Sequence, residues 1–261
     1  MKTALEAHNL TVSYSGKPVL WNVDFHIPTG KMVGILGPNG SGKTTLLKCA
    51  MHLLKSDGGF IKLLDSAFKE AINNIAYVPQ RQSVDWDFPA SVEEVVAMGL
   101  YKPKKLIQKI GSAEKLAIKE ALKQLKIEDL AKRQIGELSG GQQQRVFIAR
   151  ALVRNADLFI LDEPFVGIDA QTEAIILDLL RKKVIEGKTV ICVHHDLKTA
   201  KEYFDWILFM NKHVVANGPI KEVYNDDNLD ATYNRPYDIL EAISDRVKQE
   251  SFSIKSYKNK S

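Results

Sequence analysis

Apolar and polar residues alternate along the first thirty positions of the chain. The segments 5–14, "LEAHNLTVSY", and 19–27, "VLWNVDFHI", place apolar side chains at about every second position. This period is typical of half-buried strands, in which successive side chains point to opposite faces of a sheet. We therefore expect antiparallel strands near the N-terminus.

The pattern then becomes a continuous apolar run that leads into a glycine loop. Residues 31–36, "KMVGIL", precede the loop, and residues 43–54, "KTTLLKCAMHLL", follow it with a helical pattern. The run predicts a buried strand, the loop and then a helix. A further short strand is expected at 75–80, "IAYVPQ".

A long helical pattern with lysine-rich faces extends from about residue 92 to residue 154. Apolar runs return at 157–164, "DLFILDEP", and 189–196, "TVICVHHD", and both are typical of central parallel strands. The segment 172–187 between them predicts a crossover helix that ends at Gly187. The pattern favours an α/β fold, with a helical insert between two parts of one core.

Composition places the chain among ordinary globular domains. It has 261 residues, of which 45% are hydrophobic and 26% charged, and its net charge of +4 is too mild to indicate nucleic-acid binding. Cys49 and Cys192 have no CxxC partner, which favours a reducing compartment. Because no apolar run reaches 18 residues and no signal peptide is visible, we expect the chain neither to span a membrane nor to leave the cytosol.

The glycine loop, "GPNGSGKTT", fits the pattern G-x-x-x-x-G-K-[ST] between a predicted strand and a predicted helix. In such a P-loop, backbone N–H groups surround the β-phosphate of a nucleoside triphosphate. We expect Lys43 to reach the β- and γ-phosphates and the hydroxyl of Thr44 to bind Mg²⁺. The predicted ATP-binding residues are Gly37, Pro38, Asn39, Gly40, Ser41, Gly42, Lys43, Thr44 and Thr45.

Two adjacent carboxylates, Asp162 and Glu163, end the predicted strand "LFILD". Open α/β sheets bind ligands at the carboxyl ends of their strands, so we expect Asp162 to hold Mg²⁺ and Glu163 to polarise the attacking water. The alternative is that both are ordinary surface turn residues.

A second candidate anion site lies at the start of the helix "ELSGGQQQRVFIARAL". Ser139 and Gln142 form an S-x-x-Q capping box, which by itself explains these two residues. It does not explain Gly140 and Gly141, because glycine weakens a helix start. Uncovered N–H groups at a helix N-terminus would explain them, since such groups bind anions.

Taken together, these motifs resemble those of the nucleotide-binding subunits of ATP-binding cassette (ABC) transporters, from about Leu5 to Tyr224. The matching segments, in the family's order, are "GPNGSGKTT", "VPQ", "LSGGQ", "LFILDE" and "VHHDL", while "FVGID" after the proline of "LFILDEP" departs from the family's commonest pattern. The resemblance implies a P-loop NTPase core with an antiparallel β subdomain over residues 5–237, a helical subdomain inserted at about 82–154, and a basic C-terminal extension at 238–261. ATP and Mg²⁺ are the implied cofactors.

The resemblance also assigns roles to single residues. It implies that Tyr14 stacks on adenine, that Gln80 senses Mg²⁺ and the attacking water, and that His195 contacts the γ-phosphate. Asp169 is implied to cross a dimer interface. A half-buried strand residue is the alternative for Tyr14. A metal site in the His-His-Asp tandem at 194–196 is disfavoured, because adjacent strand residues point to opposite faces.

In this family two subunits pack head to tail, which implies that Ser139, Gly140, Gly141 and Gln142 close over the γ-phosphate held by the partner. The resemblance further implies an integral membrane permease that docks near Gln80 and, indirectly, an extracytoplasmic solute-binding protein. It places the chain at the cytoplasmic face of the membrane, without a nucleic-acid partner.

The segment 81–99, "RQSVDWDFPASVEEVVAMG", resembles the subgroup that serves manganese, zinc or iron importers. The alternative is that Trp86 and Phe88 simply pack the insert. The basic run at 101–109 is a solvated face or meets lipid headgroups. Import of a siderophore or cobalamin, an ABC ATPase acting on nucleic acid or ribosomes, and a regulator without turnover are the other functions considered.

Overall fold

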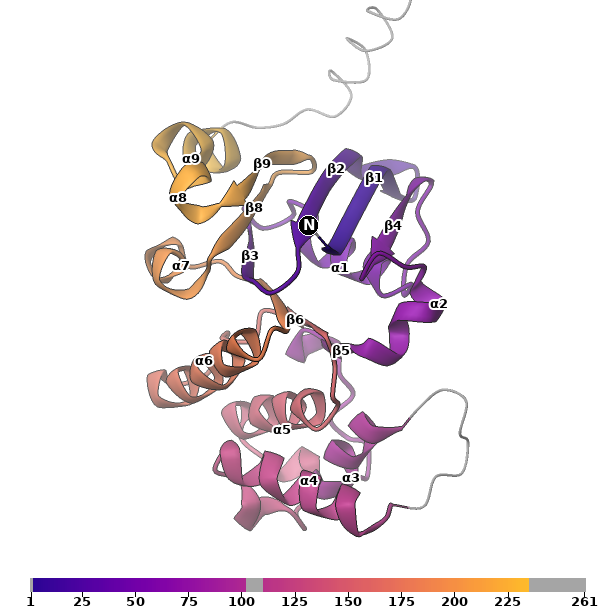
Figure 1. Ribbon diagram of the computed structural model, residues 1–261, viewed down its shortest axis with the longest axis vertical. Coiled ribbons are helices and arrows are strands. Elements are labelled where there is room, and N and C mark those ends of the chain that lie inside the picture. The colour runs from indigo at the N-terminus through magenta and orange to yellow at the C-terminus, as the bar shows by residue number, and fades with distance from the viewer. Residues whose placement is uncertain (1, 102–109, 235–261) are drawn as a thin grey trace, which may run out of the picture.

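The structure is a computed structural model that describes residues 2–101 and 110–234. Within these residues the strands form two sheets, one of three strands in the order β2-β1-β4 and one of six in the order β5-β6-β7-β3-β8-β9. Figure 1 shows the small sheet at the upper right and a group of helices at the lower end. The expected α/β class is confirmed. The predicted C-terminal extension lies outside the described residues.

The small sheet is built on the N-terminal hairpin that alternation predicts. Strand β1 (Thr3–Tyr14) pairs antiparallel with β2 (Lys17–Pro28) and, on its other edge, with β4 (Gly58–Leu63). The two-residue connection at Ser15 and Gly16 has positive φ at both positions, 49° and 77°. This conformation is that of a type I′ turn, whose twist matches the twist of the strands it joins.

The main sheet carries the buried strands. Its parallel members are β5 (Ile75–Val78), β6 (Leu158–Asp162), β7 (Thr189–Val193), β3 (Met32–Leu36) and β8 (Trp206–Met210). Strand β9 (Val214–Pro219) closes one edge antiparallel to β8. Every residue of β3, β6 and β7 is buried, as expected for parallel strands covered on both faces.

Two helices that adjoin the main sheet end in the same way. Helix α6 (Ala170–Ile185) is the expected crossover between β6 and β7, and Gly187 follows it with φ of 83°. Helix α1 (Lys43–Ala50) ends four residues before the predicted end because His52 adopts φ of 53° and the N–H of Leu53 donates to the carbonyl of Lys48. A left-handed residue after the last turn terminates a helix by a Schellman motif.

Among the described residues, four further helices outside the predicted insert are short. They are α2 (Phe68–Ala71), α7 (Leu197–Tyr203), α8 (Ile220–Val223) and α9 (Asp226–Tyr233), with 3₁₀ turns at Ile72–Asn74, Arg81–Ser83, Met98–Leu100, Glu128–Leu130 and Ile135–Glu137. In the described part of the chain, no helix is both long and apolar enough to cross a membrane.

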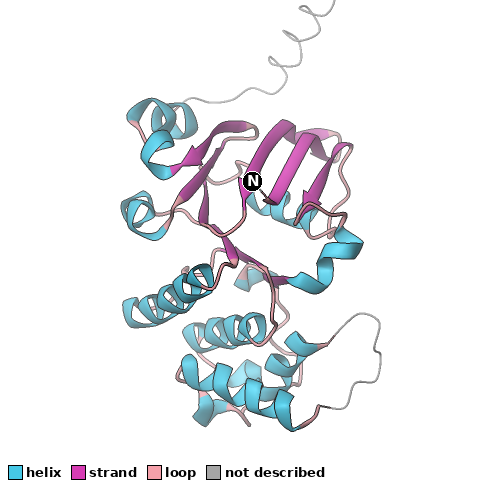
Figure 2. Cartoon of the chain, in the orientation of Figure 1, coloured by secondary structure: helices cyan, strands magenta, loops and turns pink. Residues whose placement is uncertain are grey.

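The predicted helical insert lies between β5 and β6 in the chain. It consists of α3 (Val92–Ala97), α4 (Ser112–Gln124) and α5 (Gly140–Leu152), and α5 packs against both other helices. Figure 2 shows these helices together at one end of the molecule. Most of the basic run at 101–109 lies outside the described residues. The subdomain limits of 82 and 154 remain a prediction.

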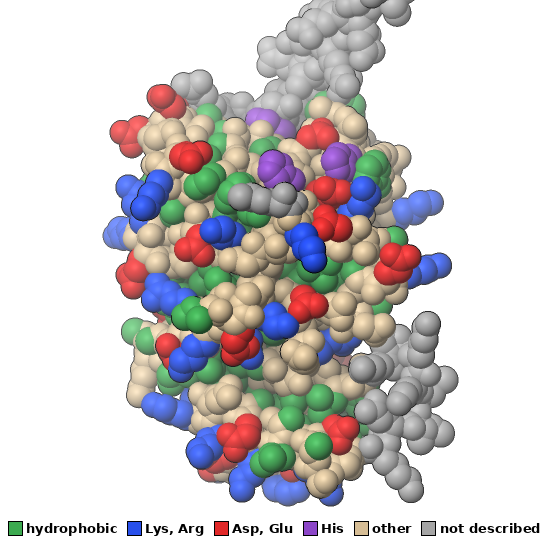
Figure 3. Space-filling model, viewed as in Figure 1, with side chains coloured by type: hydrophobic (Ala, Val, Ile, Leu, Met, Phe, Trp, Pro, Cys, Tyr) green, Lys and Arg blue, Asp and Glu red, His purple; other side chains and the backbone are tan. Residues whose placement is uncertain are grey.

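Alternate residues of the buried strands belong to two different cores. On β6, Phe159 and Leu161 pack in a core shared with the helical insert, including Val146 of α5. Leu158 and Ile160 pack in a second core with the small sheet and α1. The main sheet is therefore the layer that joins the helical insert to the small sheet. On the surface shown in Figure 3, basic and acidic side chains are interspersed.

Candidate functional site

The glycine loop connects β3 to α1 and is tightly enclosed by backbone and side chains. A Cβ atom on Gly37 would lie 2.0 Å from the carbonyl oxygen of Met210, and one on Gly42 would lie 2.3 Å from Leu20. Gly42 also has φ of 96°, a conformation that side chains other than glycine rarely adopt. The backbone N–H of Lys212 donates to the carbonyl of Ser41 at 2.8 Å, which fixes the loop against the β8–β9 connection. The path of the loop is thus determined by its neighbours.

Lys43 supplies a positive charge inside this loop. The side chain is buried, and its Nζ donates to the carbonyls of Gly37 and Pro38, both at 2.8 Å. Burial lowers the pKa of the ammonium group, while the nearby carboxylates of Glu163 and Asp162 raise it. Helix α1 starts here without a side-chain cap, so its N-terminal dipole and Lys43 act on the same space. This arrangement suits a polyphosphate.

Asp162 ends β6 beside the start of α1. The hydroxyl of Thr44 donates to its Oδ1 at 3.3 Å, while Oδ2 is buried with no hydrogen-bond partner among the described residues. The carboxylate is 1% exposed, and burial raises its pKa to about 6. Thr44, Lys43 and Lys48 oppose that increase in pKa, and Glu163 adds to it. A buried carboxylate oxygen without a partner fits a cation site, because Mg²⁺ prefers hard oxygen ligands.

Glu163 and Gln80 meet because the strands that precede them are neighbours in the sheet. Strands β5 and β6 run parallel with Val78 opposite Leu161, so the residues that follow them emerge at the same edge. The amide Nε2 of Gln80 donates to Oε2 of Glu163 at 2.8 Å. Glu163 itself has φ of 54°, a strained conformation for a residue that is not glycine. The structure therefore brings Lys43, Thr44, Gln80, Asp162 and Glu163 together.

The second candidate anion site begins α5. Ser139 is its N-cap: Oγ accepts from the N–H of Gln142 at 3.4 Å, and the N–H of Ser139 donates to Oε1 of Gln142 at 2.9 Å. The predicted capping box is therefore formed. Among the described residues no hydrogen bond joins this turn to the glycine loop. The two candidate anion sites belong to different parts of the chain.

The other predicted residues lie around these groups. Asp169 caps α6, accepting from the N–H of Thr172 at 2.9 Å and from its hydroxyl at 2.8 Å, and these hydrogen bonds lower the pKa of its carboxyl. A Cβ on Gly141 would lie 3.9 Å from Oδ2 of Asp169, so the starts of α5 and α6 are adjacent. His195 is exposed after β7, and Tyr14 is 44% exposed at the end of β1.

Comparison with known proteins decides the family. The family model described as "ABC transporter" matches residues 20–166. The chain belongs to the ABC transporter family. It is therefore an ABC-type ATPase with an ATP-binding site, and the sequence resemblance is confirmed.

Individual relatives of this ABC ATPase match over most of its length. The manganese transport system ATP-binding protein MntB of Bacillus subtilis is 48% identical over 88% of this chain and 92% of its own. The zinc transport system ATP-binding protein TroB of Treponema pallidum is 46% identical over 88% of this chain and 86% of its own. An ATP-binding cassette of an ABC transporter, solved in its ADP conformation, matches with a TM-score of 0.71 and 26% identity over 88% of this chain and 98% of that one.

In this ABC ATPase His194 is buried, whereas its neighbour His195 is exposed. His194 is 3% exposed, its Nε2 lies 2.8 Å from Oγ1 of Thr199, and the rings of Phe165, Tyr203 and Phe204 surround it. Burial, with a contribution from His195, lowers the pKa of its imidazole to about 4. Across the described ranges, no group of three or more His, Cys, Asp and Glu side chains is arranged to hold a metal ion.

Trp86 and Phe88 differ in their surroundings. The ring of Trp86 packs edge-on against Phe147 of α5 at 5.1 Å between centroids, and its Nε1 donates to the carbonyl of Arg81. Phe88 remains 53% exposed. Trp86 therefore packs in the helical insert, as the alternative interpretation expects, whereas the exposed Phe88 does not fit that interpretation.

Sequence reasoning missed three residues that shape the site. The backbone N–H of Lys212 holds the glycine loop, and the carbonyl oxygen of Met210 lies close against Gly37, contacts that no side-chain motif can reveal. Arg81 contacts the start of α5, and the only available signal was its position next to Gln80.

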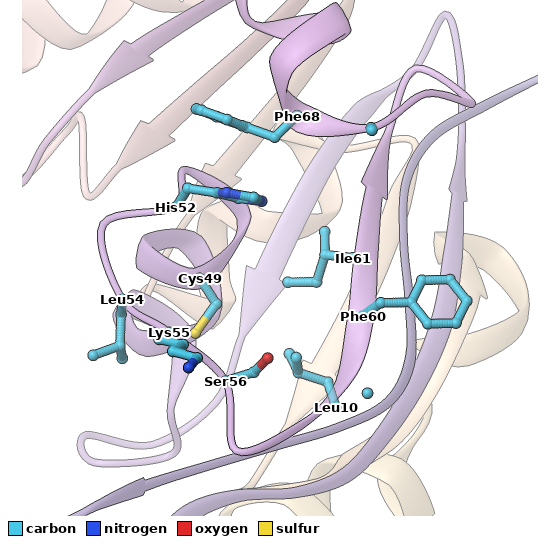
Figure 4. A pocket seen from close by; sticks show the side chains of 11 residues that line it. Leu10, Cys49, His52, Leu54, Lys55, Ser56, Phe60, Ile61 and Phe68 are labelled. Carbon is cyan, nitrogen blue, oxygen red and sulfur yellow. The ribbon is translucent and has the colours of Figure 1, made fainter.

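A pocket of about 390 Å³ lies away from these residues, between the end of α1 and β4. Figure 4 shows His52, Phe60 and Phe68 around it, and the ring of His52 stacks on Phe68 at 4.3 Å. None of the predicted site residues lines this pocket. The candidate site is therefore identified by its charged and polar side chains, and this pocket is not part of it.

Proposed function

We propose that this ABC ATPase hydrolyses ATP to drive the import of a divalent transition metal, manganese or zinc. The names of relatives that are 46% to 48% identical over most of the chain support the metal over a siderophore or cobalamin. The hydrogen bond between Gln80 and Glu163, next to Lys43 and Asp162, is the observation that supports hydrolysis.

Each group in the cluster has a chemical role in this proposal. Lys43 and the amides of the glycine loop bind the phosphates of ATP. Glu163 accepts a proton from the water that attacks the γ-phosphorus, the bond to the β-phosphate oxygen breaks, and ADP and phosphate leave. The amide of Gln80 orients the carboxylate of Glu163, and His195 contacts the γ-phosphate.

Thr44, Asp162 and Gln80 would hold Mg²⁺. When bound, this ion neutralises negative charge on the β- and γ-phosphate oxygens. The buried Oδ2 of Asp162, which lacks a hydrogen-bond partner among the described residues, supports this assignment.

The proposal includes a head-to-tail homodimer. The turn Ser139–Gln142 of one chain covers the γ-phosphate bound by its partner, and Asp169 lies at the interface between them. Two observations support this arrangement: Ser139 is exposed at the start of α5, and the hydrogen bonds of the described residues do not connect it to the glycine loop of its own chain.

A membrane permease is the second proposed partner. A groove of about 200 Å³ separates the end of α1 and β5 from α5, and Met51, Tyr77, Met98 and Arg150 are among its lining residues. Tyr77 lies three positions before Gln80, so a short helix of the permease seated in this groove would touch the strand that leads to Gln80. The chain would then act at the cytoplasmic face of the membrane, and an extracytoplasmic binding protein would select the metal.

The substitution Glu163→Gln tests hydrolysis. It should leave ATP binding unchanged and slow turnover by about 10² to 10⁴, the usual effect of losing a positioned general base. Light scattering should detect a dimer that persists in ATP and Mg²⁺. Glu120→Gln, on the exposed face of α4, is the matched control and should retain full activity. Hydrolysis at the wild-type rate by the Glu163→Gln chain would contradict the role of Glu163.

A further inference from the structure

Arg81 follows Gln80 and extends to the helical insert. Its Nε and Nη2 donate to Oε1 of Gln143, at 3.1 and 3.0 Å. Gln143 is a buried residue of α5, and its own Nε2 donates to the carbonyl of Ile135 at 3.2 Å. The amide of Gln143 is therefore held at both ends, and Arg81 provides one of the two contacts.

The guanidinium of Arg81 also lies against the first residue of α5. A Cβ atom on Gly140 would lie 2.8 Å from Cζ and 2.8 Å from Nη1 of Arg81, so glycine leaves the space that the guanidinium needs. The guanidinium also lies 5.9 Å from the centre of the Trp86 ring. The planar end of Arg81 is thus close to both the start of α5 and Trp86.

A salt bridge does not explain this placement. Among the described residues, none of the ion pairs within 4.0 Å includes Arg81. Its two hydrogen bonds form a fork on one neutral amide oxygen, a geometry that a guanidinium provides and a lysine ammonium does not.

Adjacent residues therefore hold two separate parts of the site. Gln80 donates a hydrogen bond to Glu163, which follows β6. Arg81 donates to Gln143, one residue after the turn Ser139–Gln142. We propose that Arg81 is a positioning residue that fixes Gln80 relative to the start of α5, so that Glu163 is oriented only when α5 is in place. This inference rests on the proposed function, because it concerns the orientation of the residue that activates water.

Enzyme kinetics on the full-length chain test the link. Arg81→Ala should lower kcat about tenfold, the factor that corresponds to losing about 1.4 kcal/mol of transition-state stabilisation. The affinity for ATP, measured by titration of a fluorescent nucleotide, should stay within about twofold, because among the described residues the side-chain hydrogen bonds of Arg81 go to Gln143 and none goes to the glycine loop. Arg81→Lys, which keeps the charge but has all its donors on one nitrogen, should recover part of the lost kcat.

A double-mutant cycle separates positioning from general support of the fold. In a Gln80→Ala background, Arg81→Ala should lower kcat less than about twofold further, because the group through which it acts is already absent. Arg133→Ala, an exposed arginine of the same insert, is the control and should retain wild-type kcat. All rates are measured at a temperature where melting curves show each variant folded.

The outcomes distinguish this inference from the proposed function. An active wild-type chain whose Arg81→Ala variant keeps full kcat would overturn the inference alone. A further tenfold loss in the Gln80→Ala background would overturn it as well. A wild-type chain without ATPase activity would overturn the proposed function, and the inference with it.

Discussion

The buried imidazole of His194 should make the stability of this ABC ATPase fall at acidic pH. Burial lowers the pKa of His194 from 6.5 to about 4 in the folded chain. A difference of about 2.5 units corresponds to about 3.5 kcal/mol, at about 1.4 kcal/mol per unit. Between pH 6.5 and 4 the unfolded chain binds a proton that the folded chain does not, so stability is full above this window and is lost as pH falls through it.

Urea unfolding at pH 7 and pH 4.5 measures the effect. At pH 4.5 about 2.5 kcal/mol of the contribution should already be lost in the wild-type chain. His194→Gln removes the titrating group and keeps a polar side chain at a position that contacts Thr199 in the native chain. The free energy of unfolding of this variant should therefore fall by about 2.5 kcal/mol less between the two pH values.

His26→Gln is the matched control for this experiment. His26 is exposed on β2, and the variant should keep the wild-type pH dependence because His194 is intact in it. The reasoning is refuted if the wild-type and His194→Gln chains lose equal stability between pH 7 and pH 4.5.

Two further substitutions test the local structure and the dimer. Gly187→Ala should lower the free energy of unfolding in urea by about 1 kcal/mol. Gly187 has φ of 83°, and a Cβ there would meet nothing within 4 Å, so backbone strain is the expected cost. A variant as stable as the wild type would contradict this. Ser139→Arg chains mixed with Lys43→Ala chains should form heterodimers with one intact and one wholly defective site, and so regain ATPase activity that neither variant has alone. Full activity of the pure Ser139→Arg chain would exclude a phosphate role for this turn.

Local chemistry made much of the fold predictable. The N-terminal strands follow from alternation, and Gly187 ends α6 through its own backbone conformation. The glycine loop could be predicted because its motif fixes a strand, a turn and a helix within a few residues. Asp162 and Glu163 could also be predicted from local sequence, because they lie at the end of a buried strand. The roles of these residues remain predictions.

Contacts between distant segments were not predictable from the pattern. Arg81 and Gln143 are separated by 62 positions, and their hydrogen bond depends on how the helical insert packs on β5. Trp86 was left between two interpretations because its contact with Phe147 also crosses the insert. The early end of α1 depends on the left-handed conformation of His52, which is not a residue type that signals a helix end.

Metal uptake by cells tests the central claim most directly. In a strain that lacks this chain, uptake of radioactive manganese and zinc is measured after restoring either the wild-type chain or the Glu163→Gln variant at equal abundance. The wild-type chain should restore uptake of one of the two metals, and the variant should not. Normal uptake of both metals in the deletion strain, or restoration by the Glu163→Gln chain, would contradict the proposal that ATP hydrolysis by this chain drives metal import.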